Sequence, residues 1–154
     1  MGLYSLLTQE GVIHKLTARC KREVLQSMAE RASKLVDAPT GEIVATLLER
    51  EQLGSTGVGD GVAIPHAKIE GLNKITGVLA LLDTPVSFDS AEDQPVDIVF
   101  MLLAPANATA AHLKALAKVS RLLRNRNMRD ALRGADSAES IFAIAVSDQQ
   151  NDAA

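Results

Sequence analysis

The fold class follows from two apolar segments in the middle of the chain, Ile75-Thr-Gly-Val-Leu-Ala-Leu-Leu82 and Val96-Asp-Ile-Val-Phe-Met-Leu-Leu103. Both are short and are bounded by Gly, Pro and Asp, which is typical of β-strands. They show little alternation of polar and apolar residues, and strands of that kind are usually covered on both faces. The sequence therefore predicts a sheet with helices on each side.

Helical periodicity surrounds these segments on both sides. Residues 24–36 repeat apolar side chains at helical spacing, and the hydroxyl of Thr40 is expected to cap the helix that follows. The order of elements predicts a three-layer α/β/α sandwich with a small mixed β-sheet. The expected strands are 12–16, 62–64, 75–82 and 96–103, and the expected helices are 24–36, 40–50, 113–123, 128–133 and 138–146.

Length and composition limit the functions that the chain can have. Its 154 residues, 47% apolar and 23% charged, predict one globular domain over residues 1–147 and a polar tail over 148–154. A net charge of −3 and an aromatic content of 3% do not favour binding of nucleic acid. The chain has no run of eighteen apolar residues, so no membrane span is predicted. Cys20 has no partner for an internal disulfide, so a cytoplasmic location is expected.

A glycine-rich segment, Gly54-Ser-Thr-Gly57-Val-Gly59-Asp-Gly61-Val-Ala-Ile-Pro65-His66, carries the strongest chemical signal. Gly57, Gly59 and Gly61 could present successive backbone N–H groups to a phosphate. The segment lacks the lysine of a Walker loop and the spacing of a dinucleotide-binding fingerprint. A pair of tight turns is the simpler alternative for these glycines.

Three side chains are candidates for a site beside this segment. Pro65 stiffens the approach to His66, whose neutral ring could act as a nucleophile toward phosphorus. Arg50 falls on the inward stripe of the second predicted helix, and His112 falls on the apolar face of a later one. Each also has a structural explanation: a strand-end hydrogen bond for His66, a solvated or paired cation for Arg50, and a core hydrogen bond for His112.

Two other possibilities stay open from the residues alone. A metal site is weakly supported, because three histidines and one cysteine show no metal-binding spacing. No metal or other cofactor is therefore expected. The five arginines between positions 121 and 133 form either a solvated helix face or a docking patch for an acidic partner.

The motif Leu53-Gly-Ser-Thr-Gly-Val-Gly-Asp-Gly-Val-Ala-Ile-Pro-His66 closely resembles the active-site signature of the fructose/mannitol-class enzyme IIA domains of the bacterial phosphotransferase system. The chain is most similar to the nitrogen-regulatory branch of that family. The resemblance continues through Asp83-Thr-Pro-Val-Ser-Phe88, Gln94-Pro-Val-Asp97 and Ala111-His-Leu113, so that it covers nearly the whole chain. Ala67 departs from the glycine that many members carry there.

The resemblance implies roles for the three candidates. His66 would accept a phosphoryl group on Nε2 from a small HPr-like phosphocarrier protein (NPr). Arg50 would offset the phosphate charge, and His112 would offer a ring N–H to a phosphate oxygen. No nucleotide or metal would be needed, because donor and acceptor are both phosphoramidates.

The resemblance implies a regulatory phosphocarrier, whose target proteins respond to its phosphorylation state. A sugar-specific enzyme IIA that passes phosphate to a IIB domain in carbohydrate uptake is the alternative. A binding module that transfers nothing is a third possibility, although three candidate residues retained together argue against an inactive site.

Overall fold

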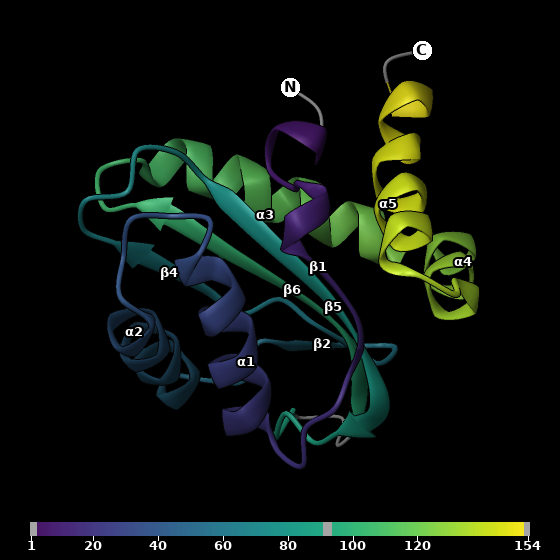
Figure 1. The fold of residues 1–154 in the computed structure, drawn as a ribbon, viewed down its shortest axis with the longest axis horizontal. Coiled ribbons are helices and arrows are strands. Elements are labelled where there is room, and N and C mark those ends of the chain that lie inside the picture. Colours follow the sequence, from purple (N-terminus) through teal and green to yellow (C-terminus); the bar gives the residue numbers. More distant parts are fainter. Residues whose placement is uncertain (1–2, 91–93, 153–154) are drawn as a thin grey trace.

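The computed structural model describes residues 3–90 and 94–152, which form one mixed sheet with helices on both sides (Figure 1). The strands are β1 (Val12–Leu16), β2 (Gly57–Gly59), β3 (Val62–Ala63), β4 (His66–Ile69), β5 (Thr76–Val86) and β6 (Val96–Pro105). The helices are α1 (Lys21–Ser33), α2 (Thr40–Gln52), α3 (Thr109–Arg124), α4 (Arg126–Gly134) and α5 (Ala138–Asp152). Two short 3-10 turns, η1 (Leu3–Ser5) and η2 (Gln9–Gly11), precede β1.

The sheet is built around β5 and β6, which pair in antiparallel fashion. The strand order is β1-β5-β6-β3-β2, and β4 also pairs with β6. β1 runs parallel to β5, while β3 and β4 run parallel to β6. The small mixed sheet predicted from the sequence is therefore confirmed.

Both faces of the central strands are buried, as their unbroken apolar character predicted. On β5, Val78 and Ala80 point into a core shared with α1 and α2, whereas Leu79 and Leu81 point into a core shared with α3, α4 and α5. Figure 1 shows α1 and α2 on one side of the sheet and α3 and α5 on the other. These two cores confirm the three-layer α/β/α arrangement.

The outer edge of β6 is shared by two short strands, β3 and β4. Val62 of β3 pairs with Ile98, and His66 of β4 pairs with Leu102 further along the same strand. Pro65 lies between them and has no N–H to donate, so the edge strand is interrupted there. Its carbonyl still accepts from the N–H of Leu102 at 2.9 Å. His66 thus begins a second edge strand, where the sequence predicted only a strand ending before it.

Several element ends differ from the prediction. The hydroxyl of Thr40 donates to Ser33 Oγ at 2.9 Å and does not cap α2, whose N-cap residue is Pro39. β5 continues to Val86 through an irregular register. Helix α5 extends to Asp152, so residues 148–152 of the expected tail are helical, and 153–154 lie outside the described residues.

None of the helices in ranges 3–90 and 94–152 combines the length and the apolar run that crossing a membrane requires.

Candidate functional site

His66 is held by the strand that carries it. Its Nδ1 lies 2.9 Å from the carbonyl oxygen of Ile64, two residues earlier in the chain. A carbonyl oxygen can only accept a hydrogen bond, so Nδ1 carries the ring proton. The other nitrogen, Nε2, is therefore left with its lone pair free for bonding.

Arg50 reaches this lone pair from the last turn of α2. Its Nε lies 3.3 Å from His66 Nε2, and its Nη1 donates to the carbonyl oxygen of Gly54 at 2.8 Å. The guanidinium carries donors only, so its contact with Nε2 requires the same tautomer of His66. The second bond holds the cation beside the imidazole, as the inward position of Arg50 on its helix predicted.

His112 approaches the same ring from the first turn of α3. The two imidazole rings are 5.6 Å apart between centroids and meet edge to face at 73°. His112 is buried, and its Nε2 has no hydrogen-bond partner among the residues that the structure describes. Burial lowers the pKa of His112, and the neighbouring His66 and Lys68 lower it further. Its ring is therefore neutral at pH 7 and retains unused hydrogen-bonding capacity.

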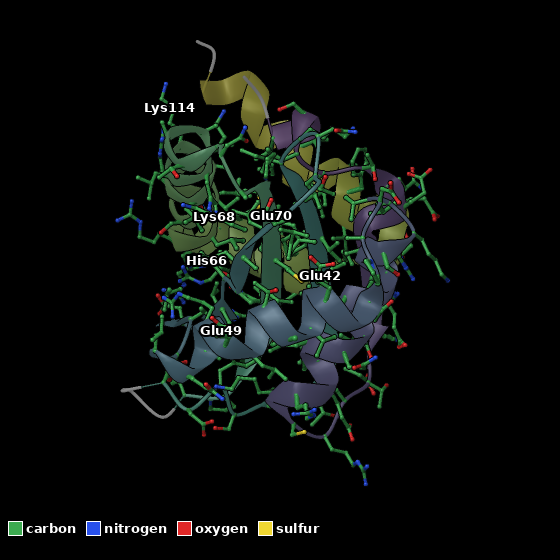
Figure 2. The ribbon with its side chains drawn as sticks, turned by 90° about the vertical axis from the view of Figure 1, so that its left-hand side faces the viewer. Glu42, Glu49, His66, Lys68, Glu70 and Lys114 are labelled. Atoms are coloured by element: carbon green, nitrogen blue, oxygen red, sulfur yellow. The ribbon has the colours of Figure 1, made fainter. Side chains whose placement is uncertain are left out.

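The three residues meet because β4 is an edge strand. α2 packs against β4 from one side of the sheet, while α3 lies on the other side with its buried face in the second core. An inner strand would separate the two layers, but side chains from both can reach the ring at an edge. In Figure 2, His66 lies between Glu49 of α2 and Lys114 of α3.

Lys68 is a neighbour of the site that the sequence reasoning missed. It lies two residues after His66 on β4, so both side chains point to the same face of the strand. Its Nζ donates to Thr109 Oγ1 at 2.8 Å, at the start of the helix that carries His112. Strand periodicity after His66 would have been the signal. Lys68 adds a second cation near the two rings.

A buried carboxylate supports the end of α2, and this too was missed. Glu51 accepts from the backbone N–H of Thr56 at 3.2 Å and from the Thr56 hydroxyl. Lys21 donates to the same carboxylate at 3.2 Å. Only 3% of the Glu51 side chain is exposed. This network fixes the loop that follows Arg50 in the chain and leads into the glycine-rich segment.

The three glycines are divided between a strand and a turn. They belong to the β2–β3 hairpin, whose turn residues Asp60 and Gly61 have φ of 58° and 78°, the conformation that a two-residue hairpin turn needs. Val62 pairs with Ile98, four residues before the Leu102 that pairs with His66, a separation of roughly 13 Å along β6. The turn alternative therefore accounts for Gly61, whereas Gly57 and Gly59 lie on β2, and a phosphate-binding role for the three glycines stays a prediction.

The arginine run between positions 121 and 133 is divided among several roles. Arg129 donates to the carbonyls of Leu123 and Arg124, at 3.1 and 2.8 Å, and is nearly buried. Arg133 binds both carboxylate oxygens of Asp97 and donates to the Asp60 carbonyl at 2.7 Å. Arg129 therefore ties α4 to the end of α3, and Arg133 ties α4 to the hairpin and β6, so these two arginines do not form a free docking patch.

In the described part of the chain, no group of three or more histidine, cysteine, aspartate or glutamate side chains could hold a metal ion. The site instead offers an imidazole nitrogen lone pair, an adjacent guanidinium, a second cation and a neutral buried imidazole. Such a set can attack an electrophilic phosphorus and stabilise negative charge on its oxygens.

A mixed sheet with helices on both faces is also the architecture of solved IIA proteins of the phosphotransferase system. Residues 5–147 match the family model for "Phosphoenolpyruvate-dependent sugar phosphotransferase system, EIIA 2", and the chain belongs to that family.

Relatives within the family point to one branch of it. A "Nitrogen regulatory protein" of Bradyrhizobium diazoefficiens is 43% identical, over 94% of this chain and 94% of that protein. One from Escherichia coli is 37% identical, over 94% of this chain and 89% of that protein. The crystal structure of nitrogen regulatory protein IIA-Ntr from Neisseria meningitidis superposes with a TM-score of 0.87 at 31% identity, covering 93% of this chain and 98% of that one.

Proposed function

We propose that this protein is a regulatory phosphocarrier of a nitrogen-regulatory phosphotransferase system, and that Nε2 of His66 accepts a phosphoryl group from the phosphohistidine of an HPr-like carrier (NPr). The observation that carries the proposal is the unprotonated Nε2 of His66 with the Arg50 guanidinium 3.3 Å from it. The names of the relatives support the regulatory assignment.

The transfer needs no net movement of a proton. The Nε2 lone pair forms the new N–P bond while the N–P bond in the carrier breaks, and the carrier's imidazole leaves with that electron pair. The Nδ1–H of His66 keeps donating its hydrogen bond to the Ile64 carbonyl, and this bond stabilises the positive charge that the ring develops. Both bonds are phosphoramidates, so the exchange is close to thermoneutral and requires no nucleotide.

The neighbouring residues stabilise the charge on the phosphoryl oxygens. Once the lone pair is used in bonding, the Nε–H of Arg50 loses its acceptor and can turn to a phosphoryl oxygen. His112 supplies a ring N–H from a buried position, where no described group competes for it. Positioning and charge stabilisation of this kind are the main contributions that proteins make to phosphoryl transfer.

A carrier protein must dock over this edge of the sheet. Leu53, three residues after Arg50, is 84% exposed, and Leu113, next to His112, is 62% exposed. Exposed leucines beside a site of this kind support a protein as the phosphoryl donor.

Phosphorylation would add about two negative charges at His66. We propose that regulated target proteins distinguish the two charge states. The single cysteine supports a cytoplasmic location for this exchange.

The deciding experiment incubates the purified protein with phosphoenolpyruvate, enzyme I and the HPr-like carrier, and follows intact mass. Wild type should gain one phosphoryl group, and His66→Ala should gain none. His14→Ala is the matched control, because His14 lies on β1, which β5 and β6 separate from β4; it should be phosphorylated like wild type. Equal mass gain by His66→Ala would exclude the assignment.

The sugar-specific alternative predicts one further step. If the phosphorylated protein passed its phosphoryl group to a purified IIB domain of the fructose or mannitol class, and then to sugar, carbohydrate uptake would replace regulation as the assigned output.

A further inference from the structure

A cavity of about 950 Å³ lies apart from the histidine site, between α3, η1 and the loop that joins β4 to β5. Its wall on α3 extends from Ala108 to Arg121, and Leu6 and Ile75 come from the other two segments. Neither His66, Arg50 nor His112 lines it. The proposed phosphoryl transfer therefore leaves this cavity without a function.

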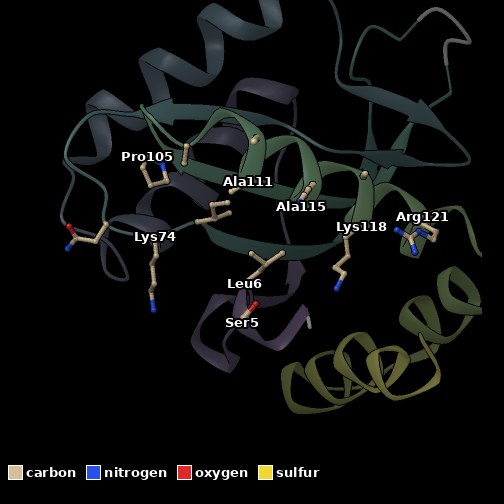
Figure 3. A pocket seen from close by; sticks show the side chains of 14 residues that line it. Ser5, Leu6, Lys74, Pro105, Ala111, Ala115, Lys118 and Arg121 are labelled. Atoms are coloured by element: carbon tan, nitrogen blue, oxygen red, sulfur yellow. The ribbon is translucent and has the colours of Figure 1, made fainter. Parts of the chain in front are cut away.

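The charged residues around the cavity are all cations. Lys74, Lys114, Lys118 and Arg121 line it, and no aspartate or glutamate does. The whole chain carries 19 acidic and 16 basic residues, so a lining of one sign runs against its overall charge. Figure 3 shows Lys74 and Lys118 extending in the same direction on either side of Leu6. Their fields add in the space between them.

Most of these cations have no counter-ion within the protein. Lys74, Lys114 and Arg121 are exposed, and none of them makes an ion pair with a residue in the described ranges. Elsewhere in the same molecule Lys21 pairs with Glu51 and Arg133 with Asp97. The cavity thus concentrates unneutralised positive charge that an external anionic group could satisfy.

The centre of the cavity is apolar. Its floor is formed by Leu6, Ile75, Pro105, Ala111 and Ala115, and the cations surround it. An apolar centre with a charged rim is the usual composition of a protein-docking surface. The lining holds no aromatic ring for a nucleobase to stack on, and its polar side chains are exposed or half-buried, which disfavours a nucleotide or a small organic anion.

We propose that this groove binds an acidic amphipathic helix of a partner protein. Between Ala111 and Arg121 the wall of α3 is about 15 Å long, the length of roughly three helical turns. A helix laid along it would place an apolar stripe on the floor and carboxylates against Lys114 and Arg121. This proposal does not depend on phosphoryl transfer at His66.

The test uses a fluorescent helix-forming peptide of about 15 residues, with leucines at helical spacing and glutamates on both flanks. Its binding to the unphosphorylated full chain is measured by fluorescence anisotropy at low salt. The double variant Lys114→Glu, Arg121→Glu should bind the peptide with a dissociation constant at least about tenfold higher. The matched control is Arg22→Glu with Lys34→Glu, which changes net charge equally at two exposed residues of α1 and its C-cap. It should change the constant less than about twofold.

In an NMR titration with the same peptide, the amide chemical shifts of Leu6, Ala111 and Ala115 should change. Equal weakening by both double variants would overturn the proposal, because it would show attraction to net charge alone. Shifts clustered at Leu53 and Leu113 would also overturn it. So would inorganic polyphosphate that shifts the groove amides when the peptide does not, since the groove would then be a small-anion site.

Discussion

Arg50 Nε lies 3.3 Å from His66 Nε2, the ring nitrogen that the Ile64 carbonyl leaves unprotonated. The guanidinium therefore occupies the position that an arriving phosphoryl group would take. Its second bond, to the Gly54 carbonyl, holds it close when the first is exchanged. In the proposed transfer, Arg50 would therefore stabilise the charge on the phosphoryl oxygens with little movement.

Replacing Arg50 should slow phosphorylation of His66 without unfolding the protein. For Arg50→Ala we expect a loss of about 10²-fold in the rate from the HPr-like carrier, the usual effect of removing one charge-stabilising donor. Arg50→Lys keeps the charge but loses the Nε–H, so an intermediate rate is expected. Rates are followed by intact mass, with Arg22→Gln on α1 as the control. Loss of the thermal transition in Arg50→Ala would instead assign the residue a structural role.

Leu113→Asp should impair docking of the carrier more than the chemistry. Leu113 is 62% exposed beside His112, so a carboxylate there removes apolar contact without disturbing the core. We expect about a tenfold higher KM for the phosphorylated carrier. The rate with phosphoramidate, a small donor that needs no docking surface, should be unchanged. An equal loss with both donors would contradict this role for Leu113.

His112 should make stability depend on pH. Burial, with nearby positive charge, lowers its pKa below the ordinary value of 6.5, so the unfolded chain binds a proton more readily. Stability contributed by neutral His112 is therefore present above about pH 6.5 and is lost as the pH falls below it. Calorimetry from pH 5 to 7 should show a shallower slope for His112→Gln than for wild type. Identical slopes would contradict this.

Glu51→Gln should destabilise the protein by about 2 kcal/mol, because it leaves the Lys21 ammonium and the two Thr56 donors without their carboxylate. Urea unfolding measures the change in the free energy of unfolding. Glu49→Gln is the matched control on the same helix, at an exposed position, and should stay within about 0.5 kcal/mol of wild type. A similar effect of both variants would mean that the network contributes little.

Gly77→Ala should destabilise the protein by about 1–3 kcal/mol through overpacking. A Cβ at Gly77 would lie 2.6 Å from Phe100 Cε1, across the β5–β6 pair. The aromatic ring is fully buried and cannot move aside freely. Gly71→Ala is no suitable comparison because its φ is 88°, whereas Gly41, with nothing within 4 Å of its added Cβ, serves as the control. Thermal unfolding of the two variants is the measurement: Gly77→Ala should lower the midpoint temperature, and Gly41→Ala should not. Equal midpoints would contradict overpacking at Gly77.

Local sequence patterns were enough to predict the layers of the fold. The unbroken apolar segments at 75–82 and 96–103 predicted strands buried on both faces, because apolar side chains on both sides of a strand must both leave water. The alternation of helical segments around them predicted the sandwich. The motif ending at His66 pointed to phosphotransfer chemistry through its resemblance to the IIA family, which needs no coordinates.

Long-range pairing lay beyond such patterns. Arg50 and His112 are 16 and 46 residues from His66 in sequence, and they reach it because β4 is an edge strand. Local periodicity does not determine the order of the strands. The glycines and the arginine run show the same limit. Gly61 forms a hairpin turn against Asp97, and Arg133 binds the Asp97 carboxylate and the Asp60 carbonyl, 36 and 73 residues away in sequence.

Residue type and periodicity can be read from neighbours along the chain, so hydrophobic patterning predicted a covered sheet and two helical layers, and residue type supplied a candidate nucleophile. The environment of each side chain is a property of neighbours in space. Folding therefore set the contact of Arg50 with His66 and the cationic groove shared by Leu6, Lys74 and α3, because each joins segments that are distant in sequence. It also lowered the pKa of His112, because packing removes that ring from water.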